Sequence, residues 1–266
     1  MRQTVLTIGT FDPTGYEGLT VDLRVFHTYR TYGLGVATAI LAHNTQAVLG
    51  VYPVPLEHVG AQLEAVFNDV KVLGVKVGAV PDLKTAELVA GVLQDVKVPI
   101  VVVDPVWRSA TGYAFHTAEN LRSWTRILGP VATVLTPNVE EAAALSDMDS
   151  IADITAMRAA CEIIHHRYRP AHVVVKGGRL SGLVRATDVL YDGRRHHVLE
   201  HPWTRSPNRL GAGDAFAAVV AALLVQGNSV QQAVTTAKQF IARAMQHTFQ
   251  IAQGPVQPLN LTIPRV

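Results

Sequence analysis

The sequence predicts an α/β fold with a central, mainly parallel sheet and helices on both faces of that sheet. First, short runs rich in β-branched residues alternate along the chain with longer segments whose apolar residues recur at helical spacing. This alternation is typical of strand–helix–strand units. Second, residues 100–103 and 173–175 are apolar at every position, as in strands that are buried on both sides.

The elements follow from these patterns in chain order. The expected strands are Val5–Ile8, Val36–Ile40, Val72–Val77, Ile100–Val103, Thr133–Leu135 and His172–Val175. Helices are expected over residues 56–67, 86–93 and 157–164, where the apolar spacing is helical, and over the apolar run 215–225. A small flap is expected around residues 10–20 and 36–53, because short segments there interrupt the alternation.

Composition limits the class of protein. One domain over residues 1–266 is expected, because no stretch of Pro, Gly or Ser is long enough to form a linker. A net charge of +2 is too small to indicate a nucleic-acid surface. The longest apolar run, residues 215–225, is too short to cross a membrane, and no signal-like segment precedes the first strand. The single cysteine, Cys161, lies in a helical pattern that indicates packing, and we expect a cytoplasmic protein.

Polar residues follow the ends of three of the expected strands. They are Asp104, Asn138 and Lys176. Ligands of open α/β sheets bind beyond the carboxyl ends of the strands, so three polar groups at one edge favour a binding site. Taken singly, each could also be a turn or helix-capping residue.

The segment Gly211-Ala212-Gly213-Asp214 stands directly before the apolar run 215–225. Its two glycines allow close approach of a ligand to backbone N–H groups, and the helix that follows adds the positive end of its dipole, so the segment suits an anion. Asp214 would lie in the first turn of that helix. By itself it could equally be a carboxylate that only stabilises the helix dipole.

Other signatures are missing from the sequence. It has no Gly-x-x-x-x-Gly-Lys-Ser/Thr loop, no Gly-x-Gly-x-x-Gly after the first strand and no Gly-x-Ser-x-Gly elbow. The pairs His165–His166 and His196–His197 lack metal-ligand spacing and are interpreted as solvated.

With these segments in place, the chain resembles the ribokinase-like superfamily of sugar and vitamin kinases. Within it the sequence is most similar to the hydroxymethylpyrimidine/phosphomethylpyrimidine kinases of thiamine biosynthesis. The similarity runs nearly end to end and includes Gly211–Asp214 and, in order, Leu6-Thr7-Ile8-Gly9, Asp12-Pro13, Asp22-Leu23, His43-Asn44-Thr45, Ala61-Gln62-Leu63, Val103-Asp104-Pro105-Val106, Thr136-Pro137-Asn138-Val139-Glu140-Glu141-Ala142 and Val175-Lys176-Gly177-Gly178.

The resemblance implies a ribokinase-like fold, ATP and Mg²⁺ as cofactors, a small heteroaromatic alcohol as substrate, and a homodimer. It also implies roles for particular residues. The catalytic group would be Asp214 as the base, with an anion hole formed by the amides of Gly211, Ala212 and Gly213. The substrate pocket would contain Gly9, Asp22 and His43.

The nucleotide and metal residues are implied in the same way. Lys176 would lie along the phosphates, the segment around Thr204–Pro207 would edge the nucleotide site, and Asn138 would stand beside them. Asn138 and Glu141 would position Mg²⁺ through water, with Asp104 nearby. The alternative for Asn138 and Glu141 is a helix cap with an acidic partner.

The chain departs from the pyrimidine kinases mainly in the substrate half. Those kinases usually carry Gly-Thr-Gly-Cys where this chain ends in Asp214, and Gln where His43 stands. Their early loop is small and glycine-rich, whereas here it is Thr14-Gly15-Tyr16-Glu17-Gly18. The Ala-Lys-Ser-Gly of the family is Ser109-Ala110-Thr111-Gly112, and Leu210 replaces a frequent Thr.

Three functions follow as hypotheses. The first is an ATP-dependent kinase acting on the hydroxymethyl group of 4-amino-5-hydroxymethyl-2-methylpyrimidine and/or its phosphate. The second is a pyridoxal or pyridoxine kinase, because that reaction uses a hydroxymethylated ring and an Asp base. The third is a non-catalytic ligand-binding relative.

Overall fold

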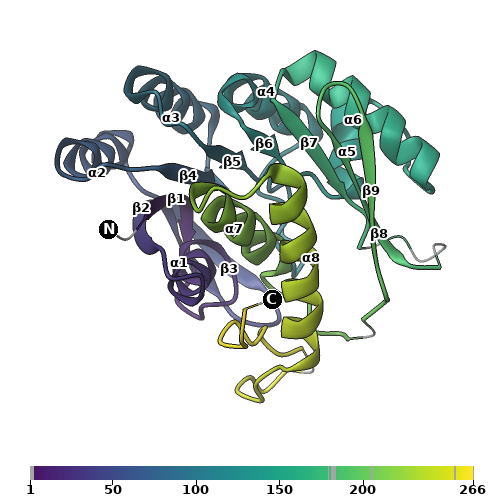
Figure 1. The fold of residues 1–266 in the computed structure, drawn as a ribbon. Helices are drawn as coiled ribbons and strands as arrows, with labels where there is room; N and C mark the ends of the chain where they lie inside the picture. Colours follow the sequence, from purple (N-terminus) through teal and green to yellow (C-terminus); the bar gives the residue numbers. More distant parts are fainter. Residues whose placement is uncertain (1–2, 179, 181–183, 205, 255, 266) are drawn as a thin grey trace.

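The computed structural model describes residues 3–178, 180, 184–204, 206–254 and 256–265. Within these residues, nine strands form one sheet in the order β3-β2-β1-β4-β5-β6-β7-β8-β9 (Figure 1). The strands are β1 (Thr4–Phe11), β2 (Tyr32–His43), β3 (Val48–Pro53), β4 (Gly74–Val77), β5 (Val101–Val103), β6 (Val134–Leu135), β7 (His172–Lys176), β8 (Ala186–Tyr191) and β9 (His196–His201).

Six neighbouring strands of the sheet, β2-β1-β4-β5-β6-β7, pair in parallel. At the two edges β3, β8 and β9 add antiparallel pairs. The predicted α/β class with a mainly parallel sheet is therefore confirmed. All six expected strands are present, with bounds that differ from the expected ones by at most four residues. The edge strands β3, β8 and β9 were not expected, because hairpins lack the strand–helix alternation on which the prediction rested.

Helices cover both faces of the sheet, as expected (Figure 1). One face carries α2 (Leu56–Asp69), α3 (Leu83–Val96), α4 (Ala118–Leu128), α5 (Val139–Ser146) and α6 (Ile154–Tyr168), and the 3₁₀ turn Gly129–Val131 follows α4. The other carries α1 (Gly18–Thr28), α7 (Ala212–Val225) and α8 (Val230–Gln246).

Strand alternation separates the two cores. In β5, Val101 and Val103 pack in the core beneath α2–α6, whereas Val102 packs in the core beneath α7. Helix α7 is buried from Ala215 to Val225 because it lies between the sheet and its neighbours α1 and α8. This explains why its sequence is apolar on every side rather than along one stripe.

The expected flap corresponds to two features. Residues 36–43 and 48–53 lie in β2 and β3, which form an antiparallel hairpin that extends the central sheet. Between β1 and α1, Asp12 accepts hydrogen bonds from the backbone N–H groups of Thr14, Tyr16 and Glu17 at 2.9 to 3.0 Å. The early loop is therefore a compact turn wound around one carboxylate.

Two further expectations concern histidine and cysteine. The interpretation of the histidine pairs as solvated is wrong for His165, His196 and His197, which are half-buried; His165 and His196 pack on the ring of Tyr191. Cys161 is buried, as expected, and burial raises the pKa of its thiol to about 12.

Over the described residues, no helix is long and apolar enough to cross a membrane, and no group of His, Cys, Asp and Glu could hold a metal ion by itself.

Candidate active site

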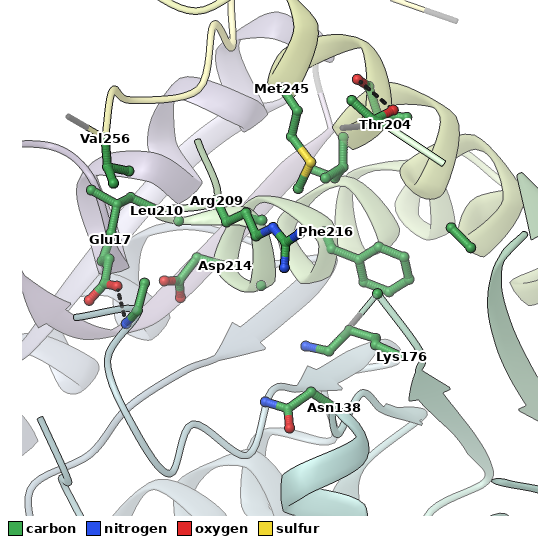
Figure 2. Close-up of a pocket in the computed structure, with 18 of the residues that line it drawn as sticks. Glu17, Asn138, Lys176, Thr204, Arg209, Leu210, Asp214, Phe216, Met245 and Val256 are labelled. Carbon is green, nitrogen blue, oxygen red and sulfur yellow. Dashed lines mark hydrogen bonds between the residues drawn. The ribbon is translucent and has the colours of Figure 1, made fainter. Parts of the chain in front are cut away.

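A cavity of about 750 Å³ opens beyond the carboxyl ends of β5, β6 and β7, between the start of α7 and the end of α8 (Figure 2). Its walls come from segments far apart in the sequence, as a crevice at the edge of a parallel sheet requires. Most of the predicted site residues line it: Asp104, Asn138, Glu141, Lys176, Thr204, Gly211, Ala212, Gly213 and Asp214. The sheet edge that the sequence indicated is thus the site of the cavity.

The glycine loop before α7 fits its neighbours closely. Gly211 has a φ of 73°, and a Cβ atom there would lie 2.0 Å from the carbonyl oxygen of Tyr16. Only glycine meets both conditions. The N–H of Ala212 donates to the carbonyl of Arg209 at 3.1 Å, so of the three predicted anion-binding amides it is the least available.

Asp214 stands in the first turn of α7 and its carboxylate faces the cavity (Figure 2). Lys76 donates to its Oδ1 at 2.7 Å and the N–H of Gly18 donates to its Oδ2 at 3.1 Å. Burial raises the pKa of Asp214, but Lys76, the Gly18 amide and the more distant Lys176 together hold that pKa below its usual value. The carboxylate is therefore ionised and able to accept a proton at neutral pH.

Lys176 and Asp104 form an ion pair across the floor of the cavity. Nζ of Lys176 donates to Oδ1 of Asp104 at 2.7 Å, and the hydroxyl of Thr136 donates to the same oxygen at 2.8 Å. The Lys176 ammonium also lies 5.9 Å from the ring centre of Phe216 on α7. A cation fixed beside the glycine loop can bind a polyphosphate.

Asn138 and Glu141 form a complete capping box at the start of α5. The Asn138 side chain accepts the N–H groups of Glu140 and Glu141, and Oε2 of Glu141 accepts the N–H of Asn138 at 2.8 Å. The second oxygen of Glu141 accepts the N–H of Trp107 at 3.3 Å. The capping alternative is thus present, yet both side chains still line the cavity. Burial raises the pKa of Glu141 to about 7, with Asp104 adding to the rise and Lys176 opposing it.

Glu17 joins two loops at the cavity wall. Its Oε1 accepts the N–H of Ala110 at 2.7 Å, which ties the early loop to the segment after β5 (Figure 2). Burial and the neighbouring Asp214 raise the pKa of Glu17 to about 7. Tyr16, which could have stacked on a ligand, is buried and is not among the described residues that line the cavity.

The predicted substrate residues Gly9, Asp22 and His43 are likewise absent from the described lining of the cavity. Asp22 and His43 are buried, and several of their polar atoms have no hydrogen-bond partner within the described residues: Oδ1 of Asp22 and both ring nitrogens of His43. Nδ1 of His43 stands 3.4 Å from Oδ2 of Asp12. Buried polar atoms without partners are unusual in a finished core, and either a ligand or a buried water would complete their bonding.

Sequence reasoning missed two lysines of this region. Lys76 on β4 contacts Asp214, and Lys238 on α8 lines the cavity and pairs with Asp188 on β8 at 2.8 Å. A signal existed for Lys76, since it is the one charged residue within the expected strand Val72–Val77. Thr204 lies at the α8 side of the cavity, where its hydroxyl donates to the carbonyl of Ala242 at 3.5 Å; residue 205, beside it, is outside the described residues.

Comparison with known proteins agrees with this geometry. The family model for phosphomethylpyrimidine kinase matches residues 12–260. A hydroxymethylpyrimidine/phosphomethylpyrimidine kinase of Haemophilus influenzae is 35% identical, over 94% of this chain and 93% of its own. A pyridoxine kinase of Bacillus subtilis is 34% identical, over 95% and 94%. The structure of Staphylococcus aureus pyridoxal kinase with AMP-PCP and pyridoxal superposes with a TM-score of 0.89 at 29% identity, covering 98% of this chain and 94% of the other.

Proposed function

Because the chain belongs to the phosphomethylpyrimidine kinase family, and is thus a phosphotransferase with an alcohol group as acceptor, we propose that its substrate is 4-amino-5-hydroxymethyl-2-methylpyrimidine and/or the phosphate of that compound. The phosphoryl donor is ATP, and relatives of this fold bind ADP and AMP-PCP. The observation that carries the proposal is the placement of Asp214, which faces the same cavity as Lys176 and the glycine loop.

In this proposal Asp214 accepts the proton of the substrate hydroxyl. The hydroxyl oxygen then forms a bond to the γ-phosphorus of ATP as the bond from that phosphorus to the β–γ bridging oxygen breaks, and ADP leaves. Phosphoryl transfer depends on positioning and on neutralising charge more than on covalent chemistry. The positive end of the α7 dipole, the amides of Gly211 and Gly213, and the ammonium of Lys176 supply that neutralisation.

Magnesium fits the other side of the cavity through water. Over the described residues no group of His, Cys, Asp and Glu could hold a metal ion by itself. Both oxygens of Glu141 and Oδ1 of Asp104 also accept hydrogen bonds from the protein, which favours contact with the ion through water. Mg²⁺ usually keeps several waters and is held by one or two carboxylates together with substrate phosphates. Asp104, Asn138 and Glu141 would hold that hydrated ion, which supplies positive charge to the phosphate oxygens.

The orphaned atoms of Asp22 and His43 support a substrate role for both residues. A hydroxymethyl group and an aromatic nitrogen could satisfy them. Pyridoxal is the second candidate, because a relative at 34% identity is named pyridoxine kinase and a related structure contains pyridoxal. Both rings carry a hydroxymethyl group and a ring nitrogen, so the fold alone does not separate them.

The test is a phosphorylation screen. The purified protein is incubated with Mg-ATP and, separately, with hydroxymethylpyrimidine, its phosphate and pyridoxal, and each phosphorylated product is quantified by mass spectrometry. Highest kcat/KM for the pyrimidine or its phosphate supports the proposal, and highest kcat/KM for pyridoxal replaces it with the second candidate. Tight Mg-ATP binding by calorimetry with no turnover of any ring would assign a binding role instead.

Two lesser parts of the proposal concern assembly and location. We place the protein in the cytoplasm as a homodimer, in line with its single buried cysteine and its resemblance to the vitamin kinases. Light scattering coupled to size-exclusion chromatography tests the dimer, which predicts twice the 28.7 kDa of one chain.

A further inference from the structure

Lys76 is a buried cation in the middle of the sheet. It lies on β4, between β1 and β5, and only 1% of the residue is exposed. Its strand neighbours Val75 and Val77 point into the core beneath α2–α6, so alternation directs the Lys76 side chain to the opposite face, where α1 and α7 lie. An ammonium in such a place is stable only when it is fully paired.

Its partners are one carboxylate from each of those helices. Nζ donates to Oδ1 of Asp214 on α7 at 2.7 Å and to Oδ2 of Asp22 on α1 at 2.9 Å. The hydroxyl of Thr7 on β1 also donates to Oδ2 of Asp22, at 2.5 Å. Lys76 therefore connects the sheet to both helices that border the candidate site.

Gly78 provides the space that this arrangement needs. A Cβ atom at residue 78 would lie 2.7 Å from Nζ of Lys76 and 3.7 Å from Oδ1 of Asp214. No φ in the left-handed region requires glycine there, and the atom in closest approach is the end of a flexible side chain. The absence of a side chain at residue 78 thus lets the ammonium reach Asp214.

We propose that Lys76 is a positioning residue for phosphoryl transfer, which fixes the Asp214 carboxylate in its ionised form and turns its second oxygen toward the substrate. The proposal rests on the proposed function, in which Asp214 is the base. Oδ1 accepts the shorter, charge-assisted bond from Lys76 at 2.7 Å, and Oδ2 accepts the longer bond from the Gly18 N–H at 3.1 Å. Each oxygen keeps one lone pair, and that of Oδ2 is the more basic because its oxygen is not bonded to the ammonium.

The charges around Asp214 agree with this assignment. Lys76, Lys176 and Arg209 are the nearby cations, and Asp22, Glu17 and Asp104 are the nearby acids. Burial raises the pKa of Asp22 to about 7, whereas the pKa of Asp214 is lowered. Opposite shifts in two carboxylates that share one ammonium place the negative charge on Asp214, the group that must accept a proton.

Two substitutions test the role. Lys76→Met removes the charge at similar length, and deprives Asp22 and Asp214 of the cation that they share. Gly78→Ala keeps every ionisable group but displaces the ammonium. Both should move the acid limb of the pH profile of kcat to higher pH, by about one unit or more for Lys76→Met, because Asp214 then holds its proton more tightly. Turnover at neutral pH should fall on the order of tenfold or more, with the KM for ATP changed less than threefold.

The control is Gly91→Ala on α3, where a Cβ atom would meet nothing within 4 Å; its profile should match wild type. A structural role alone would lower stability or kcat equally at every pH and leave the acid limb in place, and that result in either variant overturns the inference. Should Lys76→Met fail to fold, Gly78→Ala decides alone. Asp214→Asn separates the two proposals. If Asp214→Asn retains turnover, the proposed base is wrong. If Asp214→Asn is inactive while the acid limb of Lys76→Met and Gly78→Ala stays where it is in wild type, only the role of Lys76 fails.

Discussion

The N–H of Gly18 donates to Oδ2 of Asp214 at 3.1 Å, joining the first residue of α1 to the first turn of α7 across 196 positions of the sequence. The bond places the end of the early loop directly against the group proposed as the base. Gly18 itself has a φ of 62°, and a Cβ atom there would lie 2.2 Å from the carbonyl oxygen of Thr10. The loop therefore has little freedom to move away from Asp214 without breaking this contact.

Asp214→Asn should lower turnover by about two orders of magnitude or more, because a positioned base contributes on the order of 10²–10⁴-fold. Asparagine keeps the size of the side chain, so binding of ATP should be largely unchanged. Steady-state kinetics and calorimetry with Mg-ATP measure the two effects. Turnover close to wild type would show that Asp214 serves only the helix dipole and its ion pair with Lys76.

Gly213→Ala should leave the fold intact and reduce turnover. A Cβ atom at residue 213 would make ordinary contacts, 3.5 Å from Oδ2 of Asp104 and 3.6 Å from Nζ of Lys176, and alanine suits a helix better than glycine. The methyl group would, however, lie against the Lys176–Asp104 ion pair on the cavity side of the glycine loop, where the proposal places the transferring phosphoryl group. The melting temperature and kcat are compared with those of Gly60→Ala on α2, where a Cβ atom lies 3.9 Å from Leu88. Equal turnover in both variants would show that the transferring phosphoryl group does not bind at Gly213.

Glu141→Gln tests the metal role against the capping role. Glutamine has one oxygen where Glu141 has two, so one of the bonds to the N–H groups of Asn138 and Trp107 is lost, at about 1 kcal/mol of stability. If Glu141 also holds hydrated Mg²⁺, the magnesium concentration for half-maximal rate should rise severalfold. An unchanged magnesium dependence with the same loss of stability would leave Glu141 as a helix cap.

Glu17→Gln should change how stability depends on pH. The folded pKa of Glu17, about 7, lies above its usual 4.5, so the folded state holds this proton more tightly than the unfolded chain. The corresponding stability is present below about pH 4.5 and is lost as pH rises through 7. Glutamine keeps an oxygen for the Ala110 N–H and does not ionise. The melting temperature of Glu17→Gln, measured relative to that of wild type, should therefore be higher at pH 8 than at pH 5.5.

The matched control for this prediction is Glu64→Gln on the exposed side of α2. Its difference from wild type should be the same at both pH values. A Glu17→Gln difference that is equally flat would mean that the buried carboxylate titrates in its usual range.

What the sequence could predict depended on local pattern. The parallel strands and the strand-end residues Asp104, Asn138 and Lys176 followed from alternation and from the rule that ligands bind at carboxyl ends. The site around Lys76 did not, because its partners Asp22 and Asp214 are 54 and 138 positions away. These three side chains come together because β4 lies next to β1 and because Lys76 points to one particular face of β4. A strand of three or four residues is too short for its hydrophobic alternation to predict that face.

The antiparallel edge strands and the conformation of the early loop could not be predicted from local sequence pattern, for other reasons. The β8–β9 hairpin turns at Asp192, which accepts the N–H groups of Arg194 and Arg195, and such a turn gives no strand–helix rhythm. The early loop folds around Asp12, whose bonds to Thr14, Tyr16 and Glu17 are invisible in composition. In that arrangement Glu17 lines the cavity and Tyr16 is buried away from it. The sequence alone does not predict which of these two adjacent side chains faces the cavity.

His43 is the residue on which substrate choice should depend. It is buried, its two ring nitrogens have no hydrogen-bond partner in the described part of the chain, and Asp12 lies 3.4 Å from Nδ1. Burial alone would lower the pKa of His43, but Asp12 and Glu17 raise it above the usual value. The protonated form of His43 is therefore favoured more than in a free imidazole, and that form has two donors and no acceptor.

An aminopyrimidine edge presents both an amino donor and a ring-nitrogen acceptor. Glutamine can accept from the amino group and donate to the ring nitrogen, whereas protonated His43 has no acceptor for the amino group. His43→Gln should therefore raise kcat/KM for hydroxymethylpyrimidine relative to pyridoxal by roughly 5- to 10-fold, the worth of about one hydrogen bond. The ratio is measured at pH 7.5 with saturating Mg-ATP, and His58→Gln on exposed α2 should leave it unchanged. A ratio that stays flat or falls in His43→Gln would mean that another residue reads the ring, and would weaken the case for the pyrimidine over pyridoxal.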